Sequence, residues 1–129
     1  MSKVSLDRRE IKILLLEGIA PSAVETFRTA GYTNLELHRK ALPEPELVER
    51  LREAYIVGIR SRTQLTPAVL SEAKKLIAVG CFCIGTDQVA LAEARDRAIP
   101  VFNAPFSNTR SVAELVLGQI IMLMRGIFP

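Results

Sequence analysis

Short apolar runs alternate along the chain with segments whose apolar residues recur at helical spacing. Residues 11–18, 54–60 and 76–82 are almost continuously apolar, which is typical of strands that are buried on both faces of a parallel sheet. Residues 34–39 alternate between apolar and polar positions and therefore suit an edge strand with one wetter face. A fifth strand is predicted at residues 99–104. This order of elements is typical of an α/β protein with a doubly wound parallel sheet.

Four amphipathic segments separate the predicted strands. Helices are expected over residues 20–32, 44–54, 66–75 and 88–97. Gly31 suits the C-terminal cap of the first helix, because glycine tolerates the left-handed backbone found there. Thr66 and Pro67 suit the N-cap and the first position of the third helix. Lys74 and Lys75 are expected in its last turn, where the helix dipole favours cations.

The final apolar segment is different, because residues 108–127 predict one long helix with apolar side chains on nearly every face. Ser111 and Glu114 could form a capping box at its start. A helix of this kind must be buried all round, and a small sheet can cover only one stripe of it. We therefore expect it to pack against something that these 129 residues do not supply, either the rest of a larger enzyme or a partner.

Composition and charge narrow the class of protein. With 129 residues, of which 49% are hydrophobic and 24% charged, the chain suits one folded globular domain. The net charge of +3 is small and scattered, so no nucleic-acid partner is expected. The N-terminal residues are polar and predict no secretion signal, and residues 112–124 are too short and too polar to span a bilayer. We expect a cytoplasmic protein without a membrane partner.

Two cysteines, Cys81 and Cys83, lie at the end of the fourth predicted strand. Positions i and i+2 on a strand are poorly placed to bridge each other, so we expect reduced thiols that act as small core hydrophobes. The single histidine, His38, lies on the predicted edge strand and suits a surface residue better than a base. No metal site is expected, because further ligands at suitable spacing are lacking. A Ser-His-Asp set is excluded, and neither G-x-G-x-x-G nor G-x-x-x-x-G-K-[ST] occurs.

Three segments lie at the carboxyl ends of predicted strands, at residues 60–63, 81–87 and 103–110. Ligands bind at the carboxyl ends of the strands in doubly wound sheets, so these segments should converge on one crevice. Arg60 and Arg62 would point to the same side, close to a predicted helix start, and would suit a phosphate or a carboxylate. The alternative is that both arginines pair with surface carboxylates such as Glu36 or Glu53.

Two further residues could contribute to this crevice. Gly85 would let the backbone approach a ligand closely, and Asn108 offers an amide at another helix start. Each signal is weak alone, since a glycine after a strand is usually turn geometry and Asn108 could be only an N-cap. Together with the arginines they indicate an anion pocket without a visible catalyst.

The chain resembles the N-terminal segment of the bacterial D-3-phosphoglycerate dehydrogenases, a branch of the NAD-dependent D-2-hydroxyacid dehydrogenase family, in "LLLEGI", "GIRSRTQLT", "GCFCIGTDQV" and "IPVFNAPFSNTRSVAELVLG". The resemblance implies oxidation of 3-phosphoglycerate to 3-phosphohydroxypyruvate with NAD, in L-serine biosynthesis. It also implies a flavodoxin-like parallel five-stranded sheet with helices on both faces, in a substrate-binding domain whose N-terminal part is residues 1–107. Residues 108–129 would be the long helix that crosses to a Rossmann cofactor domain outside this chain.

The resemblance also implies which residues bind the substrate. They are Arg39, Arg60, Ser61, Arg62, Cys83, Ile84, Gly85 and Asn108. The first four would lie at the phosphate, with Arg39 in place of a lysine that is common in the family. The backbone of residues 83–85 would hold the substrate carboxylate, and Asn108 would line the crevice. The catalytic residues and the NAD-binding residues would lie outside the chain, so the chain alone is expected to be inactive.

Other functions stay open at this point. The chain could be a stand-alone anion-binding or oligomerisation module, and residues 112–124 are expected to pair the isolated chain into a homo-oligomer. A glycerate or hydroxypyruvate reductase of the same family is a further alternative, although the arginine pair favours a phosphorylated substrate. The receiver domains of signalling proteins are excluded, because Glu17 and Arg60 stand where these domains carry an acidic cluster and an aspartate.

Overall fold

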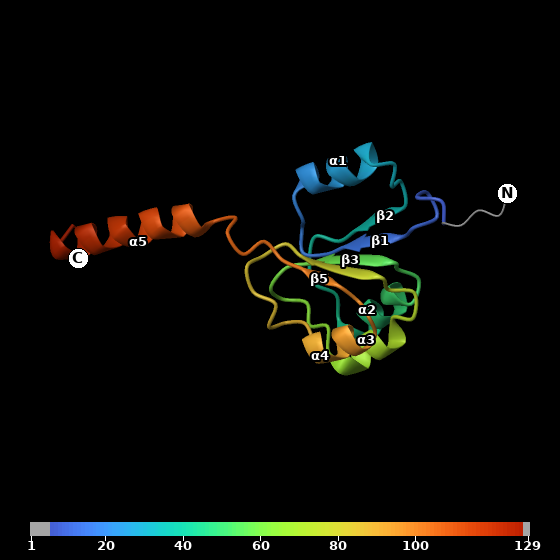
Figure 1. Cartoon of the computed structure of the whole chain (residues 1–129). Coiled ribbons are helices and arrows are strands. Elements are labelled where there is room, and N and C mark those ends of the chain that lie inside the picture. Colours follow the sequence, from blue (N-terminus) through green and yellow to red (C-terminus); the bar gives the residue numbers. More distant parts are fainter. Residues whose placement is uncertain (1–5, 128–129) are drawn as a thin grey trace.

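The computed structural model of the chain describes residues 6–127. It contains a five-stranded sheet in which all strands are parallel and follow the order β2-β1-β3-β4-β5 (Figure 1). The strands are β1 (Ile13–Leu15), β2 (Leu35–Leu37), β3 (Ile56–Ile59), β4 (Ala78–Cys81) and β5 (Val101–Phe102). This is the flavodoxin-like order of doubly wound sheets, so the predicted fold is confirmed and β2 lies at the predicted edge. The direction of winding reverses between β1 and β3.

Helices cover both faces of the sheet, as predicted. They are α1 (Pro21–Thr29), α2 (Glu44–Leu51), α3 (Pro67–Glu72) and α4 (Leu91–Asp96), followed by α5 (Thr109–Met124). Figure 1 shows α1 alone on one face of the sheet and α2, α3 and α4 together on the other. The sheet therefore separates a smaller apolar layer under α1 from a larger layer under the other three helices.

The side chains of β1 and its next residue supply both apolar layers. Leu14 and Leu16 point into the larger layer, whereas Ile13 and Leu15 point into the smaller one, and all four are at most 1% exposed. Burial on both faces is the reason why this stretch of sequence is continuously apolar. The same burial fixes the carboxyl end of β1 firmly within the sheet.

Two predicted helix boundaries are confirmed. Gly31 follows α1 with a φ of 90°, the left-handed conformation that glycine adopts without strain. Thr66 is the N-cap of α3, and its Oγ1 accepts a hydrogen bond from the N–H of Val69 at 3.3 Å. The start of α3 is thus fixed shortly after the carboxyl end of β3.

The end of α3 differs from the prediction. The helix stops at Glu72, so Lys74 and Lys75 lie beyond its last turn. Ala73 leaves the helical region, with φ −82° and ψ 67°, because the chain turns here to enter β4. Lys75 instead binds Glu53 on the surface, with 2.7 Å between Nζ and Oε2.

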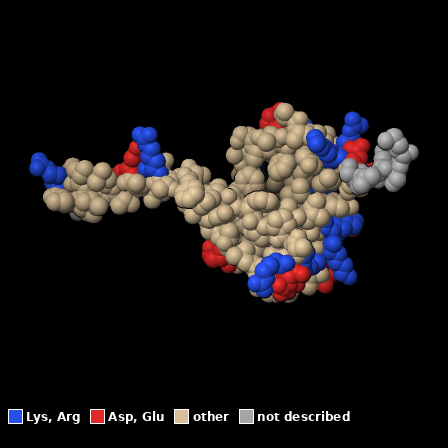
Figure 2. Space-filling model, viewed as in Figure 1, with Lys and Arg blue, Asp and Glu red and all other residues tan. Residues whose placement is uncertain are grey.

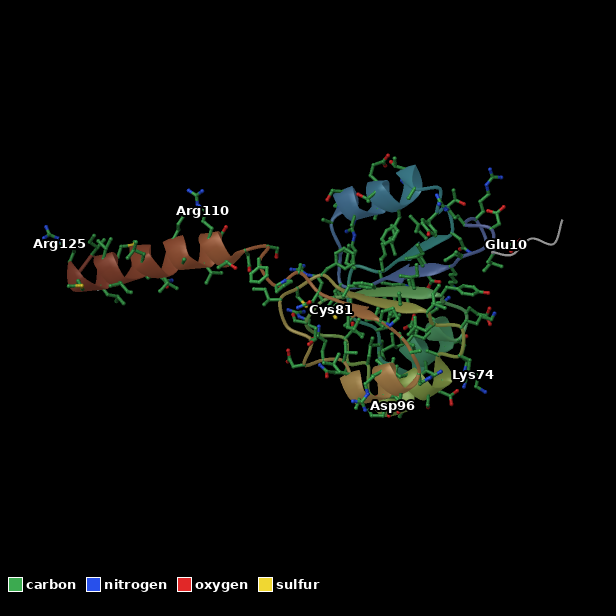
Figure 3. All side chains as sticks on the ribbon, in the orientation of Figure 1. Glu10, Lys74, Cys81, Asp96, Arg110 and Arg125 are labelled. Atoms are coloured by element: carbon green, nitrogen blue, oxygen red, sulfur yellow. The ribbon has the colours of Figure 1, made fainter. Side chains whose placement is uncertain are left out.

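Helix α5 leaves the body of the molecule and points away from the sheet (Figure 1). None of its residues is buried, and Figure 2 shows an almost uncharged surface between its two ends. The side chains of Arg110 and Arg125, near those ends, extend into solvent in Figure 3. As predicted, the rest of the described chain does not cover this apolar helix.

The predicted capping box at the start of α5 is wrong. Asn108 occupies the N-cap position instead of Ser111, and its side chain makes no capping hydrogen bond. Because the helix already begins at Thr109, Ser111 lies within its first turn. Glu114 binds Arg110 four residues earlier, with 2.6 Å between Oε1 and Nε.

Candidate functional site

A small polar cavity lies where the sheet reverses its winding. Its volume is about 230 Å³, and its residues follow the carboxyl ends of β1, β2 and β3. The cavity is lined by Glu17, Arg39, Lys40, Ala41, Arg60, Ser61 and Arg62. Four cations and one carboxylate thus meet at the place where doubly wound sheets bind their ligands. We call this the cationic cavity, and its charge suits an anion that carries more than one negative charge.

The cations of the cationic cavity are not engaged elsewhere. Within residues 6–127 none of these four side chains forms an ion pair. The two carboxylates considered as alternative partners are occupied, because Glu36 binds Lys12 at 2.7 Å and Glu53 binds Lys75 at 2.7 Å. The guanidinium groups are therefore available to a ligand.

Glu17 holds the loop that carries the two arginines. Its Oε1 accepts hydrogen bonds from the backbone N–H of Arg60 at 3.1 Å and of Thr63 at 2.9 Å, and its Oε2 accepts one from Arg62 at 3.0 Å. Glu17 and Gly18 both have left-handed φ angles, 62° and 63°, which turn the chain at the end of β1. Sequence reasoning missed this role, and the only signal was a Glu-Gly pair directly after a buried strand.

These hydrogen bonds keep the Glu17 carboxylate ionised. Partial burial raises its pKa, but the hydrogen bonds from Thr63, Arg62 and Arg60 outweigh that effect and lower the pKa below its usual value. The buried hydroxyl of Thr63 forms no hydrogen bond within residues 6–127, but its position next to the carboxylate also lowers the pKa. Three backbone donors of the loop, those of Arg60, Arg62 and Thr63, are thus already occupied and do not bind an anion.

Gln88 connects the arginine loop to the loop after β4. Its side chain is buried, and its Nε2 donates to the carbonyl of Arg60 at 2.9 Å and to that of Gly85 at 3.4 Å. An isolated parallel bridge between Leu65 and Val89 joins the same two segments a few residues further on. Sequence reasoning gave Gln88 no role, because nothing at its position signals contact with a loop 28 residues earlier.

The loop after β4 contains three successive backbone N–H groups, those of residues 83–85, without a partner in the described part of the chain. Its carbonyl groups are bonded to the segment after β5, since Asn103 Nδ2 donates to Ile84 at 2.7 Å and the N–H of Ala104 donates to Cys83 at 3.0 Å. The N–H groups of residues 83–85 donate no hydrogen bond to the part of the chain that the structure describes. Such successive free N–H groups can bind an oxyanion such as a carboxylate.

Both cysteines are free thiols, as predicted. Cys81 lies at the sheet (Figure 3), and burial, followed by the smaller effect of Cys83, raises its pKa to about 11. The thiol of Cys83 is half-buried and donates to the carbonyl of Gly85 at 3.3 Å. Cys81 is therefore a core residue, whereas Cys83 also shapes the loop.

The structure brings some of the predicted site residues together and leaves one apart. Those in the cationic cavity are Arg39, Arg60, Ser61 and Arg62. Residues 83–85 lie in the neighbouring loop, which Gln88 joins to the first. Asn108 lies at the start of α5, outside the cationic cavity. Lys40, which sequence reasoning missed, completes the set of cations.

His38 belongs to a separate ionic cluster around Glu36. The Glu36 carboxylate lies 2.7 Å from Lys12 Nζ, 2.8 Å from His38 Nε2 and 3.5 Å from Arg50 Nε. The predicted surface position of His38 is only partly right, because its side chain is 24% exposed. Burial raises the pKa of Glu36, but the hydrogen bonds and charges of its neighbours outweigh this and lower the pKa. The cluster fastens the edge strand β2 to α2.

Glu36→Gln is expected to lower the free energy of unfolding at neutral pH by about 1 to 2 kcal/mol, because Lys12 and Arg50 lose the charge that they face. The pKa of Glu36 is lowered in the folded state. Its charge therefore stabilises the fold above the unfolded pKa, and this contribution disappears as the pH falls through the folded pKa. Urea unfolding should show the full difference from wild type at pH 7 and a smaller one at about pH 3. A difference of the same size at both pH values would contradict this account.

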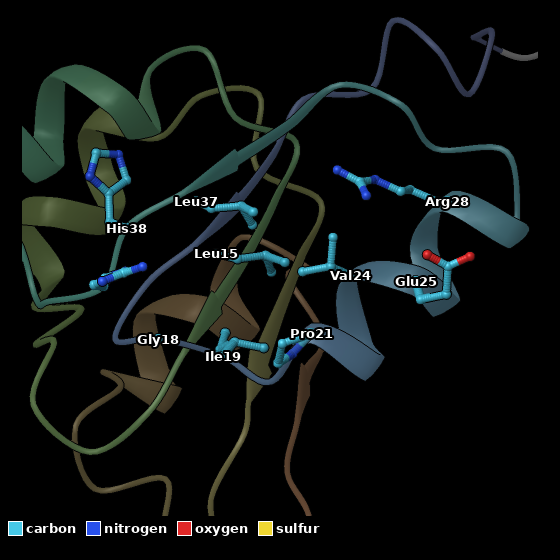
Figure 4. A pocket seen from close by; sticks show the side chains of 10 residues that line it. Leu15, Gly18, Ile19, Pro21, Val24, Glu25, Arg28, Leu37 and His38 are labelled. Carbon is cyan, nitrogen blue, oxygen red and sulfur yellow. The ribbon is translucent and has the colours of Figure 1, made fainter.

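A larger cavity lies under α1 and is mostly apolar (Figure 4). Its volume is about 770 Å³. Leu15, Val24 and Leu37 form its middle, and Arg28 lies toward its outer end in Figure 4. It shares only Arg39 with the cationic cavity. The smaller cavity is the better candidate for an anionic ligand, because its cations converge.

The described residues provide neither a metal site nor a membrane-crossing helix. Within residues 6–127, no three His, Cys, Asp or Glu side chains are grouped so that they could hold a metal ion. None of the described helices has the length and apolar character that crossing a bilayer requires. The binding groups that the site does offer are cationic side chains and free backbone N–H groups.

Comparison with known proteins gives a consistent match. The family model described as D-isomer specific 2-hydroxyacid dehydrogenase, catalytic domain, matches residues 13–118. The chain is 58% identical over 127 residues to D-3-phosphoglycerate dehydrogenase of Escherichia coli (strain K12), a match that covers 98% of this chain and 31% of that protein. The chain thus spans about a third of the length of the curated relatives that it matches.

Solved structures share the same fold. A protein of Thermus thermophilus matches with a TM-score of 0.79 and 27% identity, over 91% of this chain and 38% of that one. The NAD+-bound 3-phosphoglycerate dehydrogenase of Entamoeba histolytica matches with a TM-score of 0.71 and 24% identity, over 88% of this chain and 39% of that one. The second likeness concerns the fold alone.

Proposed function

Because the chain belongs to the D-isomer specific 2-hydroxyacid dehydrogenase family, we propose that it is the substrate-binding part of a D-3-phosphoglycerate dehydrogenase. The complete enzyme would oxidise 3-phosphoglycerate to 3-phosphohydroxypyruvate with NAD, a step of L-serine biosynthesis. The observation that carries this proposal is the cationic cavity, in which Arg60 and Arg62 have no ion-pair partner within residues 6–127. A phosphate dianion matches four cations and one carboxylate better than a monoanion would.

The two anionic ends of the substrate have separate binding groups in this proposal. The phosphate would bind in the cationic cavity, where Arg39, Arg60 and Arg62 supply charge and Ser61 supplies a hydroxyl donor. The free N–H groups of residues 83–85 would bind the carboxylate. Binding at both ends would orient the C2 hydroxyl group of the substrate, which is the group to be oxidised.

The cofactor and the catalytic groups would come from outside the 129 residues. NAD would accept the hydride in this reaction, and its binding is proposed from membership of the D-isomer specific 2-hydroxyacid dehydrogenase family. Residues 1–107 would form the N-terminal part of the substrate domain, and α5, within residues 108–129, would lead to the cofactor domain. The complete enzyme would act in the cytoplasm.

The exposed apolar side chains of α5 also need a partner. In the complete enzyme the cofactor domain would cover them, because a helix that is apolar on all faces is stable only when it is buried. In the isolated chain a second copy of the same helix would replace that cover, and the chain would form a homo-oligomer.

A comparison of two substrates tests the proposed function. The complete enzyme should oxidise 3-phosphoglycerate with NAD at a kcat/KM at least about a hundredfold above that for D-glycerate, since one charge-assisted contact is worth roughly 1.5 to 3 kcal/mol and the phosphate makes several. NADH absorbance measures both reactions. Equal kcat/KM values would contradict the phosphate assignment and would favour a reductase that acts on unphosphorylated hydroxy acids.

A further inference from the structure

We propose that Glu17 is a positioning residue: an internal carboxylate that aims Arg60 and Arg62 at the phosphate of the ligand. This inference rests on the proposed function and adds a residue that the substrate need not touch. Glu17 lies at the carboxyl end of β1, directly at the reversal of winding, whereas the arginines follow β3 on the other side of that reversal. One side chain thus spans the crevice.

Glu17 makes three hydrogen bonds with the arginine loop. Its two carboxylate oxygens accept the N–H groups of Arg60, Arg62 and Thr63 at 3.1, 3.0 and 2.9 Å. Three hydrogen bonds from one short loop to one carboxylate fix the backbone at each arginine, and hydrogen bonds to a charged acceptor are the stronger kind. The direction in which each arginine side chain leaves the backbone is therefore set before any ligand binds.

The backbone of the same turn also binds the loop after β2. The N–H of Glu17 donates to the carbonyl of Lys40 at 3.4 Å, and the N–H of Gly18 donates to that of His38 at 3.0 Å. These carbonyl groups flank Arg39, which is a further cation of the cationic cavity. All three loops that form the cationic cavity are thus held by residues 17 and 18.

Glu17 also occupies three N–H groups of the arginine loop that could otherwise bind an anion. Three N–H groups that converge on one point make an anion site by themselves. Glu17 already occupies these three groups with an ionised carboxylate, so they do not bind the phosphate, and the cationic side chains supply the charge that it needs. The same negative charge lies among four cations, so a weakly charged ligand gains less there than a dianion does.

Glu17→Gln is the sharpest change, because it keeps the length of the side chain and removes only its charge and one acceptor. The side-chain amide nitrogen would then face a backbone N–H, so two donors would point at each other with no acceptor between them. In the complete enzyme we expect the KM for 3-phosphoglycerate to rise about tenfold, with kcat within about twofold of wild type. Glu53→Gln is the matched control, since Glu53 pairs with Lys75 on the surface, away from the cationic cavity.

A double-mutant cycle separates positioning from a general structural effect. If Glu17 acts through the arginines, adding Glu17→Gln to the variant in which Arg60 and Arg62 are both alanine should raise KM by less than about twofold more. The proposal would be overturned if Glu17→Gln raised the KM by the same factor in the double-alanine variant as in the wild-type enzyme. It would also be overturned if the KM of Glu17→Gln alone equalled that of wild type. Glu17→Asp, which keeps the charge on a shorter side chain, should give an intermediate KM and replaces Glu17→Gln if that variant does not fold.

The arginine variants keep the two proposals apart. A raised KM in the arginine variants with no effect of Glu17→Gln would overturn the positioning role and leave the phosphate assignment intact. An unchanged KM in the arginine variants would overturn the phosphate assignment, and the role of Glu17 would fall with it.

Discussion

Replacing both Arg60 and Arg62 by alanine in the complete enzyme is expected to raise the KM for 3-phosphoglycerate by a factor of about 10² to 10⁴, with a much smaller change in kcat. Each guanidinium group would lose a charge-assisted contact worth roughly 1.5 to 3 kcal/mol. In the proposed binding mode the two groups bind the ligand and transfer no proton, so the loss should appear in binding. Steady-state kinetics of the double variant, with saturating NAD, measures both constants.

Two controls make this result specific to the phosphate. The KM for D-glycerate should change little, because that substrate has no phosphate to lose. A variant with alanine at Arg52 and Arg95 removes the same charge from surface arginines that pair with Glu72 and Asp96. It should leave the KM for 3-phosphoglycerate unchanged. If the double variant at residues 60 and 62 also left that KM unchanged, the ligand would not bind to these side chains.

Gly58→Ala should cause the largest loss of stability among the single changes considered, about 2 to 3 kcal/mol in the free energy of unfolding. A Cβ atom at Gly58 would lie 2.6 Å from Leu15 Cδ2, 2.9 Å from Phe82 Cε2 and 3.0 Å from Ile19 Cδ1. Leu15 is almost completely buried in β1, so the added methyl group would force Leu15, Phe82 and Ile19 to shift together, with the cavity under α1 as the space nearest to Leu15 and Ile19. The small residue in β3 therefore lets side chains from three different segments meet over the sheet.

The neighbouring strand offers a matched control for this change. Gly80 lies opposite Gly58 in the register of β3 and β4, and a Cβ there would come no closer than 3.4 Å to the Phe82 ring. Gly80→Ala should therefore change stability by less than about 0.5 kcal/mol. Urea unfolding compares the two variants, and equal losses would show that glycine itself, not crowding, matters in these strands.

The succession of strands and helices along the chain and the position of the arginines after a strand could be predicted from the sequence. Strands that are buried on both faces are continuously apolar, as the run around Leu14 is. This pattern can be recognised in the sequence without knowing which strands lie next to each other. The arginine pair is conspicuous because it follows such a strand directly. In doubly wound sheets that place is where ligands bind, so position alone carries the inference.

The residues that organise the site could not be found in this way. Glu17 and Gln88 act on a loop that lies 43 and 28 residues away from them, and no local pattern encodes which loops meet. The predicted capping box is wrong for a related reason, because Ser111 and Glu114 have the right spacing but the helix begins earlier. Local signals identify which elements form, whereas contacts between loops depend on how the whole sheet is assembled.

The buried amide of Gln88 also gives the site a fixed span. It holds the arginine loop and the loop after β4 together through the carbonyls of Arg60 and Gly85. If a ligand binds by its phosphate to one loop and by its carboxylate to the other, its length must match the spacing of the two loops. A longer ligand, with one more carbon atom between its two anionic groups, could bind to only one of the two loops at a time. In this binding mode the domain would select a ligand by its length as well as by its charge.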